Sequence, residues 1–186
     1  MTDPTDTITT ENVVASGDTG REFDLQALAD DLNNAQYDPN TFPGIVYRMD
    51  NPQSAGLIFH TGKIVCTGAK SVEDINKSAE TIFNALKQLG IAVEENPFTI
   101  QNIVSSADLG CSLNLNAVAI GLGLGQIEYE PEQFPGLVYR LDKPDVVVLL
   151  FGSGKAVITG GTEIQDAATA VNVIISKLEN VGLMNR

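Results

Sequence analysis

Histidine, cysteine and tryptophan are scarce in this chain. It has one histidine, two cysteines and no tryptophan among 186 residues. His60 stands in a turn-like segment, and no serine or cysteine occurs in a recognisable nucleophile motif. Cys66 and Cys111 lack metal-type spacing, so buried thiols are expected rather than a zinc site or a disulfide. We therefore predict that the protein is not an enzyme and uses no cofactor and no metal ion.

Long apolar segments are also missing. No apolar run approaches the roughly 18 residues of a membrane-spanning helix, and no basic-then-apolar leader begins the sequence. The expectation is a soluble intracellular protein in the cytoplasm, with no membrane partner.

Basic residues are few, at 11 against 24 acidic residues, and the net charge is −13. Such an excess of acid, taken alone, argues against a nucleic-acid partner. The charge is unevenly distributed, however. Residues 42–70 hold three basic residues against one acidic, and residues 134–162 hold three against two, so these segments together carry +3 and the rest of the chain −16. The excess of acidic residues therefore lies outside these two segments.

The same two segments contain a repeat. Residues 42–68 read FPGIVYRMDNPQSAGLIFHTGKIVCTG, and residues 134–160 read FPGLVYRLDKPDVVVLLFGSGKAVITG, with no gap between the copies. Two copies are too few for a solenoid. We therefore predict a pseudo-twofold domain, with a flexible N-terminus over residues 1–7 and repeats over residues 8–94 and 95–186.

Each copy alternates between apolar and polar positions and has turn residues at two points, which predicts a three-stranded antiparallel meander. Pairing about the first turn places Phe42 opposite Phe59, and pairing about the second places Leu57 opposite Val65. Alternate residues of a strand lie on opposite faces of the sheet, so each copy has two distinct faces.

The two faces differ in how strictly the copies keep them. Nine of ten positions are identical on one face, and three of nine on the other. Cores tolerate exchanges between apolar residues of similar volume, so the variable face is the predicted core. In the first copy the constant face carries Phe42, Gly44, Val46, Arg48, Ala55, Leu57, Phe59, Lys63, Val65 and Thr67. The variable face carries Pro43, Ile45, Tyr47, Met49, Gly56, Ile58, Ile64, Cys66 and Gly68.

Each repeat also predicts one further strand and two helices, every helix with a single apolar stripe. We expect strands over residues 9–15 and 100–105, short helices capped by Asp24 and Asn114, and long helices from Ser71 to Gly90 and from Thr162 to Gly182. With the helices on the core face, nothing covers the constant face and its phenylalanines. An uncovered apolar face of this kind marks a binding site.

Other interpretations of this face account for fewer residues. A lipid or small-ligand site would also need an apolar surface, but it would not explain Arg48 and Arg140, or the paired Asn12 and Asn102. The phenylalanines could also be the core of an ordinary sandwich. The glycines of residues 121–125 lack the spacing of a nucleotide-binding loop.

The sequence resembles the TATA-box-binding proteins in their archaeal form, from about residue 9 to residue 183. The motifs that carry the resemblance are FPGLVYRLDKP, LLFGSGK, IVCTGAKS and IQNIV. It implies an α+β fold, a pseudo-twofold saddle of ten antiparallel strands with four helices on the convex face. It also implies a general transcription initiation factor that binds TATA-box DNA in the minor groove, bends it, and recruits transcription factor B and RNA polymerase. The alternative is a sheet of the same kind that binds another ligand or protein on its concave face.

The resemblance assigns roles to aromatic and amide side chains. Phe42 with Phe59, and Phe134 with Phe151, resemble the apolar wedges by which this family kinks the duplex. The central asparagines of the family are matched by Asn12 and Asn102. An amide donor in the minor groove selects A·T pairs without distinguishing A·T from T·A, because both present only acceptors there.

The resemblance also assigns an apolar floor, phosphate contacts and a partner surface. The floor positions are Val14, Val46, Leu57, Val65 and Thr67, with Val104, Val138, Leu149, Val157 and Thr159. The phosphate contacts, which position the protein rather than specify sequence, are Arg48, Lys63, Arg140 and Lys155. The loop of Glu130, Pro131 and Glu132 resembles the stirrup that meets transcription factor B.

The acidity has its own interpretation. A sequence pI near 4.2 resembles adaptation to a salt-rich cytoplasm, where an acidic surface keeps a protein soluble. A nucleoid-associated protein of a prokaryotic cell is then expected, and ordinary acidic solubility is the alternative. The sequence leaves open whether two copies pair as a homodimer through the uncovered face in the absence of DNA.

Overall fold

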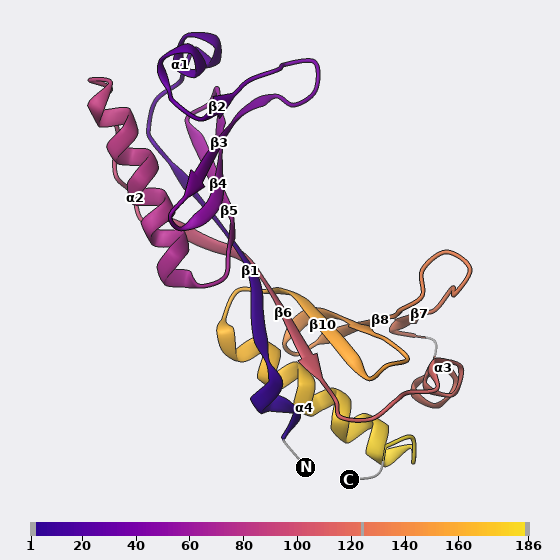
Figure 1. The fold of residues 1–186 in the computed structure, drawn as a ribbon. Coiled ribbons are helices and arrows are strands. Elements are labelled where there is room, and N and C mark those ends of the chain that lie inside the picture. The colour runs from indigo at the N-terminus through magenta and orange to yellow at the C-terminus, as the bar shows by residue number, and fades with distance from the viewer. Residues whose placement is uncertain (1–2, 124, 185–186) are drawn as a thin grey trace. The chain divides into compact units, whose positions relative to one another are not determined.

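Each repeat of the sequence folds into five strands and two α-helices in the computed structural model, which describes residues 3–123 and 125–184 (Figure 1). The first repeat contains β1 (Thr9–Asp18), α1 (Leu25–Asp31), β2 (Ala35–Gln36), β3 (Gly44–Asp50), β4 (Gln53–Phe59), β5 (Lys63–Ala69) and α2 (Val72–Gln88). The second contains β6 (Thr99–Asp108), α3 (Leu115–Leu122), β7 (Ile127–Glu128), β8 (Leu137–Asp142), β9 (Asp145–Leu150), β10 (Lys155–Gly161) and α4 (Ile164–Asn180). The predicted ten antiparallel strands and four helices are confirmed within the described residues.

The strands have the same order in both repeats. Neighbours run β2-β3-β4-β5-β1 in the first and β7-β8-β9-β10-β6 in the second. The predicted meanders are β3–β5 and β8–β10, because consecutive strands there pair with each other. The two-residue strands β2 and β7, which the alternation did not predict individually, each pair with the first strand of the meander.

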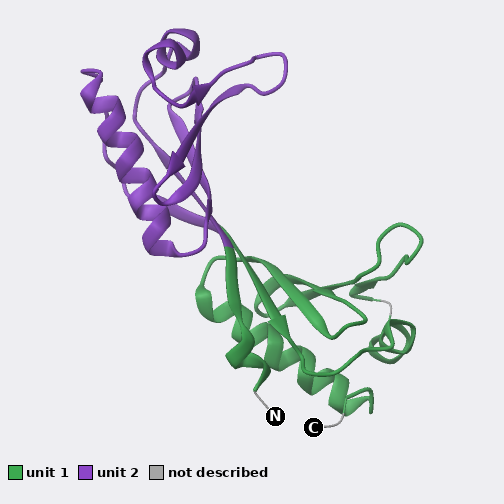
Figure 2. Ribbon diagram, in the orientation of Figure 1, with its two compact units in different colours: residues 1–11, 102–186 green, residues 12–101 purple. Residues whose placement is uncertain are grey.

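The compact units of the structure are not identical to the sequence repeats (Figure 2). Unit 2 is Asn12–Gln101, and unit 1 combines Met1–Glu11 with Asn102–Arg186. The division differs from the predicted boundary near residue 94 because β1 and β6 each contribute residues to both units.

The N-terminal segment begins with a short 3₁₀ helix, η1 (Pro4–Thr7). Pro4 is buried, and the Thr7 hydroxyl accepts a hydrogen bond of 2.8 Å from the backbone N–H of Asp108. Residues 1 and 2 of the predicted flexible N-terminus lie outside the described residues, so its flexibility stays a prediction.

The register of the first hairpin differs from the prediction by two residues. Phe59 pairs with Gly44, not with Phe42, and Asp50 pairs with Gln53. The turn between β3 and β4 therefore contains only two residues, whereas the predicted turn contained four. Because side chains alternate with period two, a shift of two residues leaves every residue of β3 and β4 on its predicted face. The second hairpin is as predicted, with Leu57 opposite Val65.

The variable face is the core in both units. Ile45, Ile58 and Ile64 are fully buried in unit 2, and the equivalent positions Leu137, Leu150 and Ala156 are buried in unit 1. The long helices α2 and α4 each lie along one side of their own sheet (Figure 1). We call the opposite side of each sheet its open face. Its apolar residues are only half-buried, since no helix of the described residues covers them.

Three of the four predicted helix starts are confirmed. The predicted cap residues of α1, α2 and α3 each accept a hydrogen bond from a backbone N–H of the first turn. The predicted cap of α4 is wrong by one residue, because its N-cap is Glu163 rather than Thr162. The Asp166 carboxylate accepts from the backbone N–H groups of Glu163 at 3.0 Å and Thr162 at 3.1 Å. One side chain thereby satisfies two amides that precede the helix.

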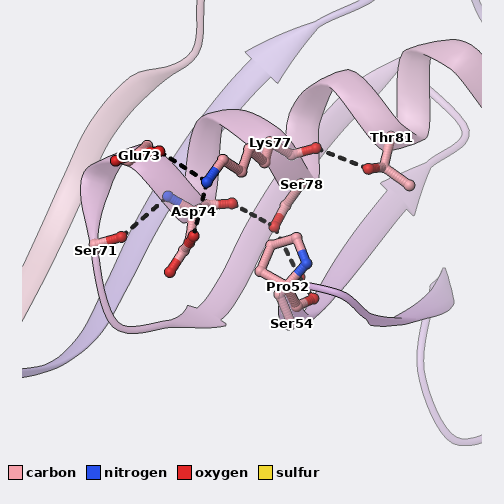
Figure 3. A network of polar contacts seen from close by, with 8 residues as sticks. All are labelled: Pro52, Ser54, Ser71, Glu73, Asp74, Lys77, Ser78 and Thr81. Atoms are coloured by element: carbon pink, nitrogen blue, oxygen red, sulfur yellow. Dashed lines mark hydrogen bonds and ion pairs between the residues drawn. The ribbon is translucent and has the colours of Figure 1, made fainter.

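A buried pair of hydroxyl groups joins α2 to the β3–β4 hairpin in unit 2 (Figure 3). Ser54 Oγ and Ser78 Oγ are 2.7 Å apart. One hydroxyl donates to the other, and the accepting serine donates to a backbone carbonyl, either Ser78 to Asp74 at 2.8 Å or Ser54 to Pro52 at 3.1 Å. Every buried side-chain polar atom of the described residues has a partner, so this polar pair can lie within the core without a desolvation penalty.

This pair leads to a prediction about stability. In urea unfolding, Ser54→Ala and Ser78→Ala should show a coupling of about 0.5–1.5 kcal/mol, the net contribution of one hydrogen bond. The matched control is Thr81→Ala, because the Thr81 hydroxyl donates only to the Lys77 carbonyl within α2 (Figure 3). The changes in the free energy of unfolding caused by Ser54→Ala and Thr81→Ala should be additive. Additivity of the two serine substitutions would show that the hydroxyls contribute nothing to each other.

Candidate nucleic-acid interface

Two aromatic pairs stand on the open faces. The rings of Phe42 and Phe59 pack edge to face with centroids 5.8 Å apart, and those of Phe134 and Phe151 with centroids 5.9 Å apart. Both distances are typical of favourable aromatic pairs. Phe134 is 38% exposed, which is unusual for a phenylalanine. The structure thus brings each predicted pair together, as diagonal neighbours in the observed register.

A glycine lies beneath each aromatic pair. A Cβ atom added to Gly136 would lie 2.6 Å from the Phe134 ring and 3.0 Å from the Phe151 ring. One added to Gly44 would lie 3.0 Å from the Phe42 ring. The missing side chain therefore lets both rings pack against the strand. Sequence reasoning assigned these glycines no role, although their identity in both copies was a signal.

The two asparagines make the same hydrogen bonds in both units. Asn12 Oδ1 accepts from the backbone N–H of Gly68 at 2.7 Å, and Asn12 Nδ2 lies 3.2 Å from Thr67 Oγ1. In unit 1, Asn102 Oδ1 accepts from Gly160 N–H at 2.7 Å, and Asn102 Nδ2 lies 3.2 Å from Thr159 Oγ1. Each amide is therefore held in a defined position on its open face.

The predicted floor residues surround these asparagines on the open faces. All of them are half-buried in the chain: Val14, Val46, Leu57, Val65 and Thr67 in unit 2, and Val104, Val138, Leu149, Val157 and Thr159 in unit 1. Thr67 pairs with Ala55 and Val65 with Leu57 across neighbouring strands, so they form a continuous apolar surface within the unit. Lys63 and Lys155 are exposed at the first residues of β5 and β10.

The two predicted arginines differ in their surroundings. Arg140 forms an ion pair with Glu128 of β7, with 3.2 Å between Arg140 Nη2 and Glu128 Oε1. Arg48 is exposed and forms no ion pair within the described residues. The residue of β2 that occupies the position of Glu128 is Gln36, which pairs with Val46 as Glu128 pairs with Val138. Because Gln36 is uncharged, the ion pair between Glu128 and Arg140 has no equivalent at Arg48.

The loops that precede the first phenylalanine of each pair also differ. In the β2–β3 loop the Asp38 carboxylate accepts from the Thr41 hydroxyl at 2.7 Å and from the Asn40 backbone N–H at 3.0 Å. These hydrogen bonds hold the pKa of Asp38 below its usual value, and the bond from Thr41 has the larger effect. In the β7–β8 loop, by contrast, the carboxylates of Glu130 and Glu132 make no hydrogen bond or ion pair within the described part of the chain.

The cysteine of the first meander does not face the open side of its sheet. Cys66 is buried on the core side of β5, and burial raises the pKa of its thiol to about 12. The thiol is therefore protonated and unreactive near neutral pH. No group of three His, Cys, Asp or Glu side chains among residues 3–123 and 125–184 could hold a metal ion. In the same residues, no helix is long and apolar enough to cross a membrane.

Comparison with known proteins gives consistent matches. The family model described as "Transcription factor TFIID (or TATA-binding protein, TBP)" matches residues 7–89 and 97–181. TATA-box-binding protein 1 of Haloferax volcanii is 64% identical over 186 residues, which is 100% of this chain and 98% of that protein. TATA-box-binding protein E of Halobacterium salinarum is 63% identical over the full length of both chains.

A solved structure is also similar to the chain over most of its length. Methanococcus jannaschii TBP is 49% identical in sequence and superimposes with a TM-score of 0.82, covering 93% of this chain and 98% of that chain. This likeness confirms the α+β fold class that the sequence motifs predicted.

Proposed function

The chain belongs to the TATA-binding-protein family of DNA-binding transcription factors, which are not enzymes, and from this membership we propose that it binds a TATA-box element in the minor groove and bends it. It thereby serves as a general transcription initiation factor. We further propose that it recruits transcription factor B and RNA polymerase, and that it acts on the nucleoid in the cytoplasm.

The observation that carries the proposal is the composition of the open faces. Each presents an edge-to-face phenylalanine pair, an amide held by two hydrogen bonds, and an apolar surface bordered by basic residues. Apolar side chains can enter a widened minor groove and unstack a base step, while a guanine amino group facing such a surface would have no hydrogen-bond partner.

A gel-shift comparison tests this function. A duplex with a TATA element should be retained by the protein, and a duplex in which G·C pairs replace the A·T pairs should bind more weakly by about 10-fold or more, since each wrong pair costs about 1–3 kcal/mol. Equal retention of both duplexes would contradict the proposal.

The β7–β8 loop is the proposed contact for transcription factor B. Glu130 and Glu132 are exposed and leave their carboxylates available to a basic partner surface. Reversing both charges to lysine should raise the dissociation constant of the ternary complex at least about 10-fold, through slower association with a basic partner. Binding to DNA alone should change less than about 3-fold, since the loop is proposed to face the partner. A ternary complex of unchanged affinity would show that the loop is only a solvated turn.

The position shared by Gln36 and Glu128 provides a further prediction. Glu128→Gln removes the acidic partner of Arg140 and should strengthen DNA binding by about 2- to 5-fold at low salt, the size expected for one exposed ion pair. Gln36→Glu, the matched reverse change beside Arg48, should weaken it by a similar factor. Both effects should disappear above about 1 M salt, where the Debye length is about 3 Å. Equal affinities for the wild type and both variants at low salt would show that the arginines do not contact phosphates.

A further inference from the structure

The asparagines of the open faces lie beside two equivalent irregularities of the sheet. The β1–β5 register shifts between Val13 and Ala15, and the β6–β10 register shifts between Ile158 and Gly161. Each irregularity contains a glycine with a left-handed backbone, Gly68 with φ of +94° and Gly160 with φ of +99°. At these points the glycine N–H donates to an asparagine side chain.

The glycine N–H distinguishes the two ends of the asparagine amide. A backbone N–H can only donate, so at 2.7 Å it requires Oδ1 rather than the amino group of Asn12. The Thr67 hydroxyl, 3.2 Å from Nδ2, can either donate or accept and would tolerate both orientations. The orientation of the amide is therefore decided by Gly68, and by Gly160 in the other unit.

The consequence concerns the group that the asparagine presents to a ligand. With Oδ1 bound to the glycine, Nδ2 carries two N–H groups, one directed to threonine and one left for a ligand on the open face. In the reverse orientation an acceptor would be presented instead. A·T pairs show only acceptors in the minor groove, whereas a G·C pair adds the guanine amino donor.

We propose that Gly68 and Gly160 are positioning residues for sequence selectivity, whose backbone N–H groups keep Asn12 and Asn102 as donors and thereby disfavour G·C pairs. The proposal rests on the proposed binding of TATA-box DNA. It differs from a purely structural role, because it concerns the discrimination between base pairs rather than the affinity for DNA or the stability of the fold.

The requirement for glycine at these positions comes from backbone conformation and not from space. A Cβ added to Gly68 would lie 3.4 Å from Ser54 Cα, and one added to Gly160 would lie 3.7 Å from Val146 Cα, both ordinary contacts. A φ near +95° is nonetheless strained for any residue with a side chain. Glycine permits the backbone direction that aims the N–H at the amide.

The hydrogen bonds can be tested in the free protein by amide hydrogen exchange. The N–H protons of Gly68 and Gly160 should exchange slowly, although both residues are exposed. Asn12→Ala should remove the protection at Gly68 and leave Gly160 unchanged, so the second unit is an internal control. Rapid exchange of both protons in the wild type would overturn the proposal, whatever the protein binds.

Selectivity is tested with TATA duplexes in which single A·T pairs are replaced by I·C or G·C. Inosine lacks the guanine amino group, so an I·C pair has the minor-groove pattern of A·T. At the sensitive positions the wild type should bind I·C duplexes within about 3-fold of A·T duplexes and G·C duplexes about 10-fold more weakly. The measured quantity is this ratio between G·C and I·C affinities, which general losses of affinity or stability leave unchanged.

The decisive variant replaces Gly68 by glycolic acid, which exchanges the N–H for an ester oxygen and adds no side chain. Repulsion between this oxygen and Oδ1 should reverse the amide, and the G·C to I·C ratio should fall from about 10-fold to about 2-fold. Asn12→Asp, which presents an acceptor directly, should lower the ratio in the same way. Thr67→Val removes the other partner of the amide and, whatever its effect on affinity, should keep the ratio near 10-fold, since Gly68 still orients the amide.

The outcomes separate the two proposals. A ratio that stays near 10-fold in both the glycolic acid and Asn12→Asp variants would overturn the positioning role. A ratio that falls in Thr67→Val would assign the orientation to threonine and overturn it as well. Failure of the wild type to bind any of the duplexes would instead contradict the proposed function, while hydrogen exchange would still decide how the amides are held.

Discussion

Phe134→Ala is expected to reduce DNA bending and to weaken binding to a TATA duplex by about 30-fold or more, because unstacking a base step takes a few kcal/mol that an apolar wedge must offset. The fold should be unaffected, since the Phe134 side chain is already 38% exposed and its removal leaves no enclosed cavity. Fluorescence energy transfer between the ends of a labelled duplex measures the bend, and a titration of the same duplex measures the affinity.

The core of unit 2 contains a matched control for this change. Phe83 and Phe98 form another edge-to-face pair, with centroids 5.7 Å apart, and Phe83 is 5% exposed. Phe83→Ala should therefore lower the free energy of unfolding by about 3–5 kcal/mol. If Phe134→Ala lowered stability to the same extent and left bending unchanged, the open-face pairs would be structural and not wedges.

Binding to a TATA duplex is expected to hold or strengthen as potassium chloride rises from about 0.5 M towards about 2 M, because apolar burial is favoured by salt and charge contacts are screened. Few basic residues border the open faces, and Arg140 is already paired with Glu128. The chain also carries a net charge of −13, so its acidic surface opposes approach to DNA at low salt. Affinity should consequently depend on the apolar floor and the phenylalanines.

If phosphate contacts dominated binding instead, the loss of affinity with salt would have a predictable magnitude. A protein that released six counterions would follow a slope of about −5 in log affinity against log salt, and would lose roughly 1,000-fold over this range. A loss of that magnitude would show that phosphate contacts dominate and that the interpretation of acidity as adaptation to salt is wrong. Arg48→Gln is the control, because removing one phosphate contact should change the slope by about 0.9. Circular dichroism across the same salt series must show that the protein stays folded.

The source of the relatives agrees with the predicted tolerance of DNA binding to salt. Haloferax volcanii and Halobacterium salinarum are halophilic archaea. An acidic surface of the kind seen in this chain keeps net charge far from zero and favours solubility. The acidic residues and the open faces thus serve separate requirements, one for the solvent and one for the proposed ligand.

The sequence by itself determined which side of each sheet is core. Period-two alternation sorts side chains between two faces whatever the details of pairing, so Ile45 and Ile58 were placed correctly although the predicted register was wrong. Comparison of the two copies then marked the constant face, where Phe42, Phe59 and their equivalents lie. The caps of α1 to α3 were predictable too, because capping depends on residues within one turn of the helix start.

Only the tertiary structure decided the features that depend on pairing between distant residues. The register of β3 and β4 was ambiguous because a shift of two residues preserves the alternation, and the number of residues in the turn had to select between registers. Strict alternation placed Gly68 in the core, but the irregularity near it leaves Gly68 exposed, since a bulge resets the alternation. The ion pair of Arg140 and Glu128 likewise required the short strand β7 to pair with β8. Alternation is a local property of the chain, whereas register, bulges and ion pairs across strands are set by which strands meet.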